Sequence, residues 1–302
     1  MTLTLSIATL VAPRQSPAVL ASALDAARRA LDAAGAPYTP GETHDARAVA
    51  LRLGGLRPAD ARALLEPVVA DLPVDLIVAP VARCRLFIAD MDSTMITVEC
   101  IDELADFVGK KAQVSAVTEA AMRGELDFEQ ALDARVALLA GLPEAALHAC
   151  YDQRVAPNLT PGGRGLIQAL NADGARTVLV SGGFTFFVDR VAAALGFQHA
   201  QANVLELAGG ALTGRVLRPI VTAAVKRAAL LAHAAELGCA LEDTVAIGDG
   251  ANDIPMIEAA GLGIAYHAKP KTIAAADAAI RHGDLSTVHY ALGLGTNRGD
   301  PV

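Results

Sequence analysis

Two aspartates, Asp90 and Asp92, have the clearest chemical potential in the chain, because they directly follow an apolar segment at residues 86–89. Alternate residues of a strand share a face, so an extended chain here brings both carboxylates into one small volume. Two carboxylates that close repel each other. Their proximity is best explained by a bound cation, or by one carboxylate being charged and the other protonated. The alternative is a solvated turn, because a lone D-x-D pattern is common where strands end.

Three later segments also place polar side chains after or beside apolar stretches. They contribute Ser181 and Gly182, then Lys226, and then Asp249, Asn252 and Asp253. Each has an ordinary explanation when taken singly: Ser181 as a turn residue, Lys226 as a surface lysine and Asp253 as a helix cap. Only their combination with the first pair indicates chemistry.

The elements that must position these side chains alternate between strand and helix from residue 85 onward. Strands are predicted at 86–89, 177–180 and 244–247, and a last short strand at 263–265 completes the set. Such alternation predicts a doubly wound parallel sheet, in which sites form at the carboxyl ends of the strands. The polar segments that follow these strands lie at such ends, and Lys226 is predicted at the start of a helix, so we expect these side chains to meet.

The ordered set of D-x-D-S-T, a strand ending in S-G, an isolated lysine and G-D-x-x-N-D resembles the haloacid-dehalogenase (HAD) superfamily of aspartyl phosphatases, over about residues 85–265. This resemblance implies an α/β fold, with a HAD-type Rossmann-like parallel sheet and a helical cap. It implies that Asp90 is the nucleophile and that Asp92 is the general acid and base. It further implies one Mg²⁺ per active site, bound by side-chain oxygens of Asp90 and Asp249 and by the backbone carbonyl of Asp92.

The same resemblance assigns the remaining residues to the phosphate. The Ser181 hydroxyl and the Gly182 N–H would bind phosphate oxygens, and Lys226 would offset charge during transfer. Asn252 would orient phosphate or a metal-bound water. Asp253 would hold Lys226 or a metal-bound water from outside the site.

A helical insertion at about residues 98–156 is predicted to form the cap. Residues 90–103 and 128–136 resemble phosphoserine phosphatases, which implies that Glu99 pairs with the substrate ammonium and Arg135 with its carboxylate. Met122 and Phe128 would supply an apolar lid. Without the resemblance, Glu99 and Arg135 would be surface helix charges.

The function implied by the resemblance is Mg²⁺-dependent hydrolysis of O-phospho-L-serine to L-serine and phosphate, the last step of serine biosynthesis. One alternative is a phosphotransferase that passes the phosphoryl group to another alcohol, or a phosphatase for another small phosphate ester. An alternative of another class is an amino-acid-sensing regulatory protein. The presence of every candidate catalytic residue argues against that class.

Residues 1–82 are predicted to form a separate α+β domain ahead of the phosphatase domain at 83–302. Strands are expected at 3–11, 46–53 and 74–81, with helices between them and a fourth short strand near Tyr38. The pattern resembles the ACT-like ferredoxin fold. The loop at residues 12–17 lacks glycine, which argues against ligand binding there and leaves a homodimer contact or a purely structural role.

Composition excludes several classes of protein. The chain has 302 residues and a net charge of −8, which argues against nucleic-acid binding. No apolar run approaches the ~20 residues of a membrane span, and no basic segment precedes the first apolar stretch, as a signal peptide requires. The four scattered cysteines favour a reduced, cytoplasmic protein without a zinc site.

Overall fold

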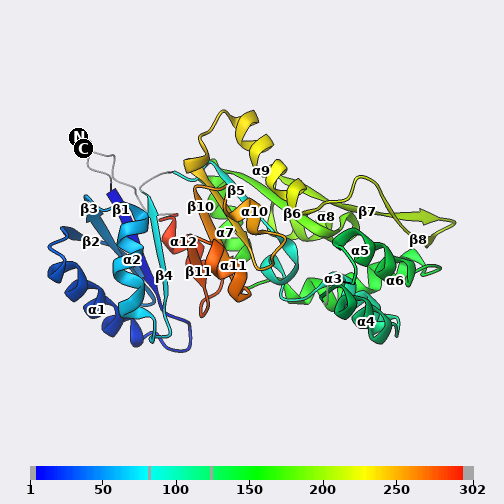
Figure 1. Cartoon of the computed structure of the whole chain (residues 1–302), viewed down its shortest axis with the longest axis horizontal. Helices are drawn as coiled ribbons and strands as arrows, with labels where there is room; N and C mark the ends of the chain where they lie inside the picture. Colours follow the sequence, from blue (N-terminus) through cyan, green and yellow to red (C-terminus); the bar gives the residue numbers. More distant parts are fainter. Residues whose placement is uncertain (1–4, 81–82, 123–124, 295–302) are drawn as a thin grey trace.

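The computed structural model describes residues 5–80, 83–122 and 125–294, which form a small and a large sheet side by side (Figure 1). The small sheet has the order β2-β3-β1-β4 and antiparallel pairing throughout. Its elements are β1 (Leu5–Val11), α1 (Val19–Ala33), β2 (Tyr38–Asp45), β3 (Ala48–Gly54), α2 (Pro58–Val69) and β4 (Asp75–Pro80). This order is the ferredoxin-like arrangement, so the predicted α+β fold and its strand near Tyr38 are confirmed. Leu3, Thr4 and Val81, also predicted in strands, lie outside the described residues.

The large sheet has the order β11-β10-β9-β5-β6-β7-β8. Its strands are β5 (Leu86–Ala89), β6 (Arg176–Phe184), β7 (His199–Ala208), β8 (Ala211–Leu217), β9 (Thr244–Gly248), β10 (Leu262–Tyr266) and β11 (Ala278–Ile280). All neighbours pair in parallel except β7 and β8, which form an antiparallel hairpin. The prediction that 263–265 is the last strand is wrong, because β11 pairs with β10. Its three residues, Ala-Ala-Ile, are too few to show a strand period.

Helices cover both faces of the large sheet, as the near-continuous apolar strand β5 requires. Phe87 and Ala89 face a core shared with α7 (Gly163–Ala172) and α8 (Thr185–Leu195). On the other face, Leu86 and Ile88 pack against residues of α9 (Ala223–Leu237) and α10 (Ile254–Ile257). Both faces of the large sheet are thus covered by apolar side chains. The ends of the strands are where polar side chains of different strands can form a site.

The predicted helical cap is present beyond the end of β5 (Figure 1). It comprises α3 (Cys100–Phe107), α4 (Lys111–Met122), α5 (Phe128–Ala137) and α6 (Glu144–Cys150), followed by the short turns η2 (Tyr151–Val155) and η3 (Ala156–Asn158). The loop between α5 and α6 is tied to the β7–β8 hairpin by backbone hydrogen bonds of 2.8 Å, from Gly141 N–H to the Leu212 carbonyl and from Leu212 N–H to the Leu142 carbonyl. The Glu144 N–H at the start of α6 adds a third, to the Gly210 carbonyl, over 2.9 Å. The hairpin therefore braces the cap against the large sheet.

The small sheet packs directly on the C-terminal part of the large unit. Ile77 and Ala79 of β4 share a buried core with Leu285 and with Val288 of α12 (Ser286–Ala291). No helix within the described ranges is long and apolar enough to cross a lipid bilayer. None of the four cysteines, all within the described ranges, forms a disulfide, and three of them are buried.

Candidate active site

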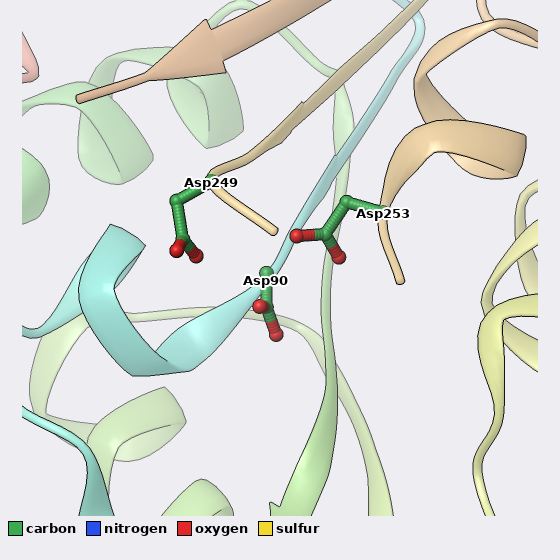
Figure 2. Close-up of side chains that lie close together, drawn as sticks. All are labelled: Asp90, Asp249 and Asp253. Atoms are coloured by element: carbon green, nitrogen blue, oxygen red, sulfur yellow. The ribbon is translucent and has the colours of Figure 1, made fainter. Parts of the chain in front are cut away.

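Three carboxylates meet where β5 and β9 end, in the acidic cluster formed by Asp90, Asp249 and Asp253 (Figure 2). One ligand oxygen from each lies within 4.8 Å of the others. The two strands are paired to their ends, where the Asp90 N–H donates to the Ile247 carbonyl over 3.0 Å. Burial, followed by the charge of Asp253, raises the pKa of Asp249 to about 6. The cluster therefore resists full ionisation unless positive charge is added.

Lys226 supplies one positive charge from the first turns of α9. Its Nζ lies 2.6 Å from Asp90 Oδ1 and 2.7 Å from Asp253 Oδ1, and the whole residue is 0% exposed. Burial alone would lower the Lys226 pKa, but Asp90 and Asp253 together raise it above its usual value. The contact with Asp253 is a hydrogen bond, whereas Asp90 Oδ1 makes no hydrogen bond of acceptable alignment. Asp90 thus keeps acceptor capacity at the centre of the site.

Asp253 begins α10 without capping it by its side chain. Its second oxygen instead accepts the Gly250 N–H over 3.0 Å, while the first accepts Lys226. The helix-cap explanation of Asp253 is therefore wrong, and its carboxylate holds the lysine and the turn that follows β9. Asn252 lies in that same turn, with its side-chain oxygen packed against Gly250.

Asp92 has hydrogen-bond partners outside the acidic cluster. The chain leaves β5 through a tight turn at Met91–Met95, in which Ser93 has a φ of +55°. Asp92 Oδ1 accepts the Cys100 N–H over 2.8 Å, and Oδ2 accepts the Ser181 hydroxyl over 3.3 Å. Burial raises the Asp92 pKa against the lowering effect of these hydrogen bonds. The two aspartates that begin as one D-x-D pair thus have different partners, as a division of roles requires.

β6 extends to Phe184, beyond the predicted strand at 177–180, but its pairing with β7 is interrupted at Ser181, Gly182 and Gly183, which form a loop against Asp92. The Gly183 N–H donates to the Ser181 hydroxyl oxygen over 2.8 Å. A Cβ on Gly183 would lie 2.9 Å from Asp92 Oδ2, so only glycine fits without displacing the acid. A Cβ on Gly182 would lie 3.4 Å from the Phe128 ring, which places this cap residue over the loop. The other predicted lid residue, Met122, ends α4, and its side chain lies outside the described part of the chain.

Glu99 and Arg135 bring the cap into the site. Glu99 Oε1 accepts the Ser93 hydroxyl over 2.6 Å, and burial, then the charge of Asp92, raise its pKa to about 7. Arg135 is partly buried, which lowers its pKa, and it feels the charges of Asp102, Glu99 and Asp92. Its Nε donates to the Ala131 carbonyl, and no described carboxylate lies within ion-pair distance of it. The guanidinium is therefore available to an anionic ligand.

Two supporting contacts had no assigned role in the sequence prediction. The Ser93 hydroxyl orients Glu99, and the Thr94 hydroxyl donates to Asp249 Oδ1 over 3.3 Å. Both residues belong to the D-x-D-S-T segment that the sequence singles out. The spacing alone does not predict their partners, because Glu99 lies across a turn and Asp249 is distant in sequence. Asn203 of β7 also contacts the Ser181–Gly183 loop, and an isolated asparagine within a strand gives no sequence signal for that contact.

Comparison with known proteins agrees with this geometry. Residues 87–258 match the family described as haloacid dehalogenase-like hydrolase. The chain belongs to this family. The hydrolase is 47% identical over 206 residues to a phosphoserine phosphatase of Albidiferax ferrireducens, which covers 67% of this chain and 86% of the relative.

Two solved structures extend the similarity to the small sheet. A HAD-family hydrolase of Salmonella enterica serovar Typhi superposes with a TM-score of 0.81 at 31% identity, covering 95% of this hydrolase and 98% of that chain. A probable phosphoserine phosphatase of Vibrio cholerae superposes with a TM-score of 0.77 at 34% identity, covering 95% and 86%. The arrangement of both sheets therefore recurs in related proteins.

Proposed function

We propose that this hydrolase converts O-phospho-L-serine to L-serine and phosphate. The observation that carries the proposal is the position of Glu99 and Arg135, which come from the cap to the same site as Asp90 and Asp92. A carboxylate and a guanidinium that pairs with no carboxylate of the described residues match the ammonium and the carboxylate of an amino acid. The phosphoserine phosphatases among the relatives support the same substrate.

The acidic cluster fits Mg²⁺, which prefers oxygen ligands. The three carboxylates of the acidic cluster lie around a single ammonium, that of Lys226, so a divalent cation would offset the remaining negative charge. Asp90 and Asp249, with the backbone carbonyl of Asp92, would hold the ion. When bound, it supplies the positive charge that allows an anionic phosphate to approach a carboxylate.

The protein groups then divide the reaction into two displacements. Asp90 attacks phosphorus, so that a bond forms from its carboxylate oxygen while the bond to the serine oxygen breaks. Asp92, whose raised pKa favours a proton, donates that proton to the departing serine oxygen. Asp92 next accepts a proton from water, which attacks phosphorus and releases phosphate from Asp90. Lys226 and the Ser181–Gly183 loop would stabilise the charge on phosphate in both displacements.

The test is phosphate release by the purified full chain with Mg²⁺, across phosphoserine, phosphoethanolamine and p-nitrophenyl phosphate. Phosphoserine should have the highest kcat/KM, because phosphoethanolamine lacks the carboxylate that Arg135 would bind. Asp90→Asn should lower kcat by more than about a thousandfold on all three, because the nucleophile is lost. Equal kcat/KM for phosphoserine and phosphoethanolamine would refute the substrate, and an active D90N would refute the nucleophile.

A further inference from the structure

One buried amide, that of Asn203, connects two parts of the site that are distant in sequence. The residue lies in β7 and is 1% exposed. Its Nδ2 donates to the Gly182 carbonyl over 2.7 Å, and its Oδ1 accepts the Val221 N–H over 2.7 Å. Both halves of the amide are thus used on backbone groups, which an apolar side chain of the same size would leave unpaired.

The first contact fixes the loop at the end of β6. The Gly182 carbonyl belongs to the peptide between Gly182 and Gly183, and the N–H of that peptide donates to the Ser181 hydroxyl oxygen. Asn203 therefore holds one end of this peptide plane, and Ser181 holds the other. The Ser181 hydroxyl in turn donates to Asp92 Oδ2, so the peptide orientation sets the position of a group that contacts the proposed acid.

The second contact fixes the start of α9. Val221 directly precedes Thr222, the N-cap residue of α9. The Lys226 N–H donates to the Thr222 carbonyl over 3.0 Å. Lys226 then reaches Asp90. Asn203 consequently sets the spacing between the Ser181–Gly183 loop and the helix that carries the buried lysine.

We propose that Asn203 is a positioning residue, which holds the loop and the lysine helix at the spacing that a phosphoryl group requires. This inference rests on the proposed function, because it takes Ser181, Gly182 and Lys226 to surround the phosphate. It assigns Asn203 no contact with substrate. The expected signature is a loss confined to the phosphate half of the site, with the amino-acid half at Glu99 and Arg135 unaffected.

The test is Asn203→Asp in the full chain with Mg²⁺. Aspartate keeps the acceptor for the Val221 N–H but places an oxygen against the Gly182 carbonyl. We expect kcat to fall about tenfold to a hundredfold, as a small misplacement of catalytic groups does. Calorimetry should show orthovanadate, a phosphate mimic, binding weaker by a comparable factor. The affinity for L-serine should change by less than about twofold, since uncoupled sites behave independently.

Asn171→Asp is the matched control. Asn171 also uses both halves of its amide: Nδ2 donates to the Gly196 carbonyl over 2.7 Å, and Oδ1 accepts the Thr177 hydroxyl over 2.9 Å. Thr177 lies at the opposite end of β6 from Ser181. N171D should lower the Tm while leaving kcat and the orthovanadate affinity at their wild-type values.

Unchanged kcat and orthovanadate affinity in folded N203D would overturn the proposal, as would equal losses for orthovanadate and L-serine. Should N203D fail to fold, Asn203→Ser, which shortens the side chain without adding charge, has the same expected results. Wild-type activity on p-nitrophenyl phosphate but not on phosphoserine would refute the proposed substrate alone. The N203D and N171D comparison would then be read from kcat on p-nitrophenyl phosphate.

Discussion

At the scale of single residues, the site separates groups of one type by their surroundings. Asp90 lies beside a buried ammonium, Asp92 is hydrogen bonded to Ser181 and Cys100, and Glu99 is hydrogen bonded to Ser93. Burial is the largest influence on the pKa of all three, and it raises each one. Their distinct neighbours, rather than their residue type, decide which one attacks, which one carries a proton and which one binds.

The raised pKa of Glu99 predicts a pH-dependent KM. Below its pKa of about 7 the carboxyl group is protonated and loses the charge that would attract a substrate ammonium. KM for phosphoserine should therefore fall as pH rises from 5.5 to 8, by roughly tenfold per pH unit below the pKa. Steady-state kinetics measure this, with Glu99→Gln as the control, since the substrate phosphate titrates equally in both. The same pH profile of KM in E99Q would contradict the assignment.

At the scale of elements, the ends of β5, β6 and β9 bring the site together, while the cap adds Glu99, Arg135 and Phe128. The S-G-G segment near the carboxyl end of β6 illustrates how closely these elements approach. Its Ser181 and Gly183 lie against Asp92 of the turn that follows β5, and its Gly182 lies against Phe128 of the cap. A side chain added at Gly183 would therefore displace the Asp92 carboxylate rather than disturb the packing of the fold.

Gly183→Ala tests this close approach. The new methyl group would lie 2.9 Å from Asp92 Oδ2 and 3.1 Å from the Ser181 hydroxyl oxygen, so one of them must shift. We expect kcat to fall by about tenfold or more, with little change in Tm. Gly165→Ala is the control, because no atom lies within 4 Å of its added methyl group and it should leave kcat unchanged. Wild-type kcat in G183A would show that the loop can relax away from the acid.

At the scale of the whole molecule, the small sheet is an integral part of the structure rather than a tethered addition. Its strand β4 shares a core with α12, and the Asp75 carboxylate, 1% exposed, accepts three backbone N–H groups of the large unit. These come from Arg281, His282 and Gly283, at 2.7, 3.1 and 2.7 Å. We therefore propose that the unit at residues 1–82 stabilises the phosphatase unit at 83–302, whatever else it binds.

Asp75→Asn should accordingly destabilise the full chain. The amide places a donor against N–H groups, and leaving buried groups unpaired costs about 1–3 kcal/mol. Urea unfolding measures the loss, and kcat of the folded protein should be unchanged because Asp75 makes no contact with the acidic cluster. Asp71→Asn, at an exposed position in the preceding turn, should stay within about 0.5 kcal/mol of wild type. Equal urea midpoints for D75N and D71N would refute the bracing role of Asp75.

Local patterns in the sequence were enough to predict both sheets, the cap and the strand-end position of the proposed site. Strand and helix periods repeat over short stretches, and a parallel sheet necessarily collects the carboxyl ends of its strands at one edge. The residues at the carboxyl ends of β5, β6 and β9 could thus be predicted to lie close together. The three-residue strand β11 could not be predicted, because so short a segment has no recognisable period.

Only the tertiary structure decided which partner each of these groups has. The Lys226 contacts with Asp90 and Asp253, the raised pKa of Glu99 and the two hydrogen bonds of Asn203 depend on burial and on distances between segments far apart in sequence. The same holds for Asp75 and the backbone turn that it caps. Residue type and spacing determine what a side chain can do, whereas the packed environment determines its charge, its orientation and its partner.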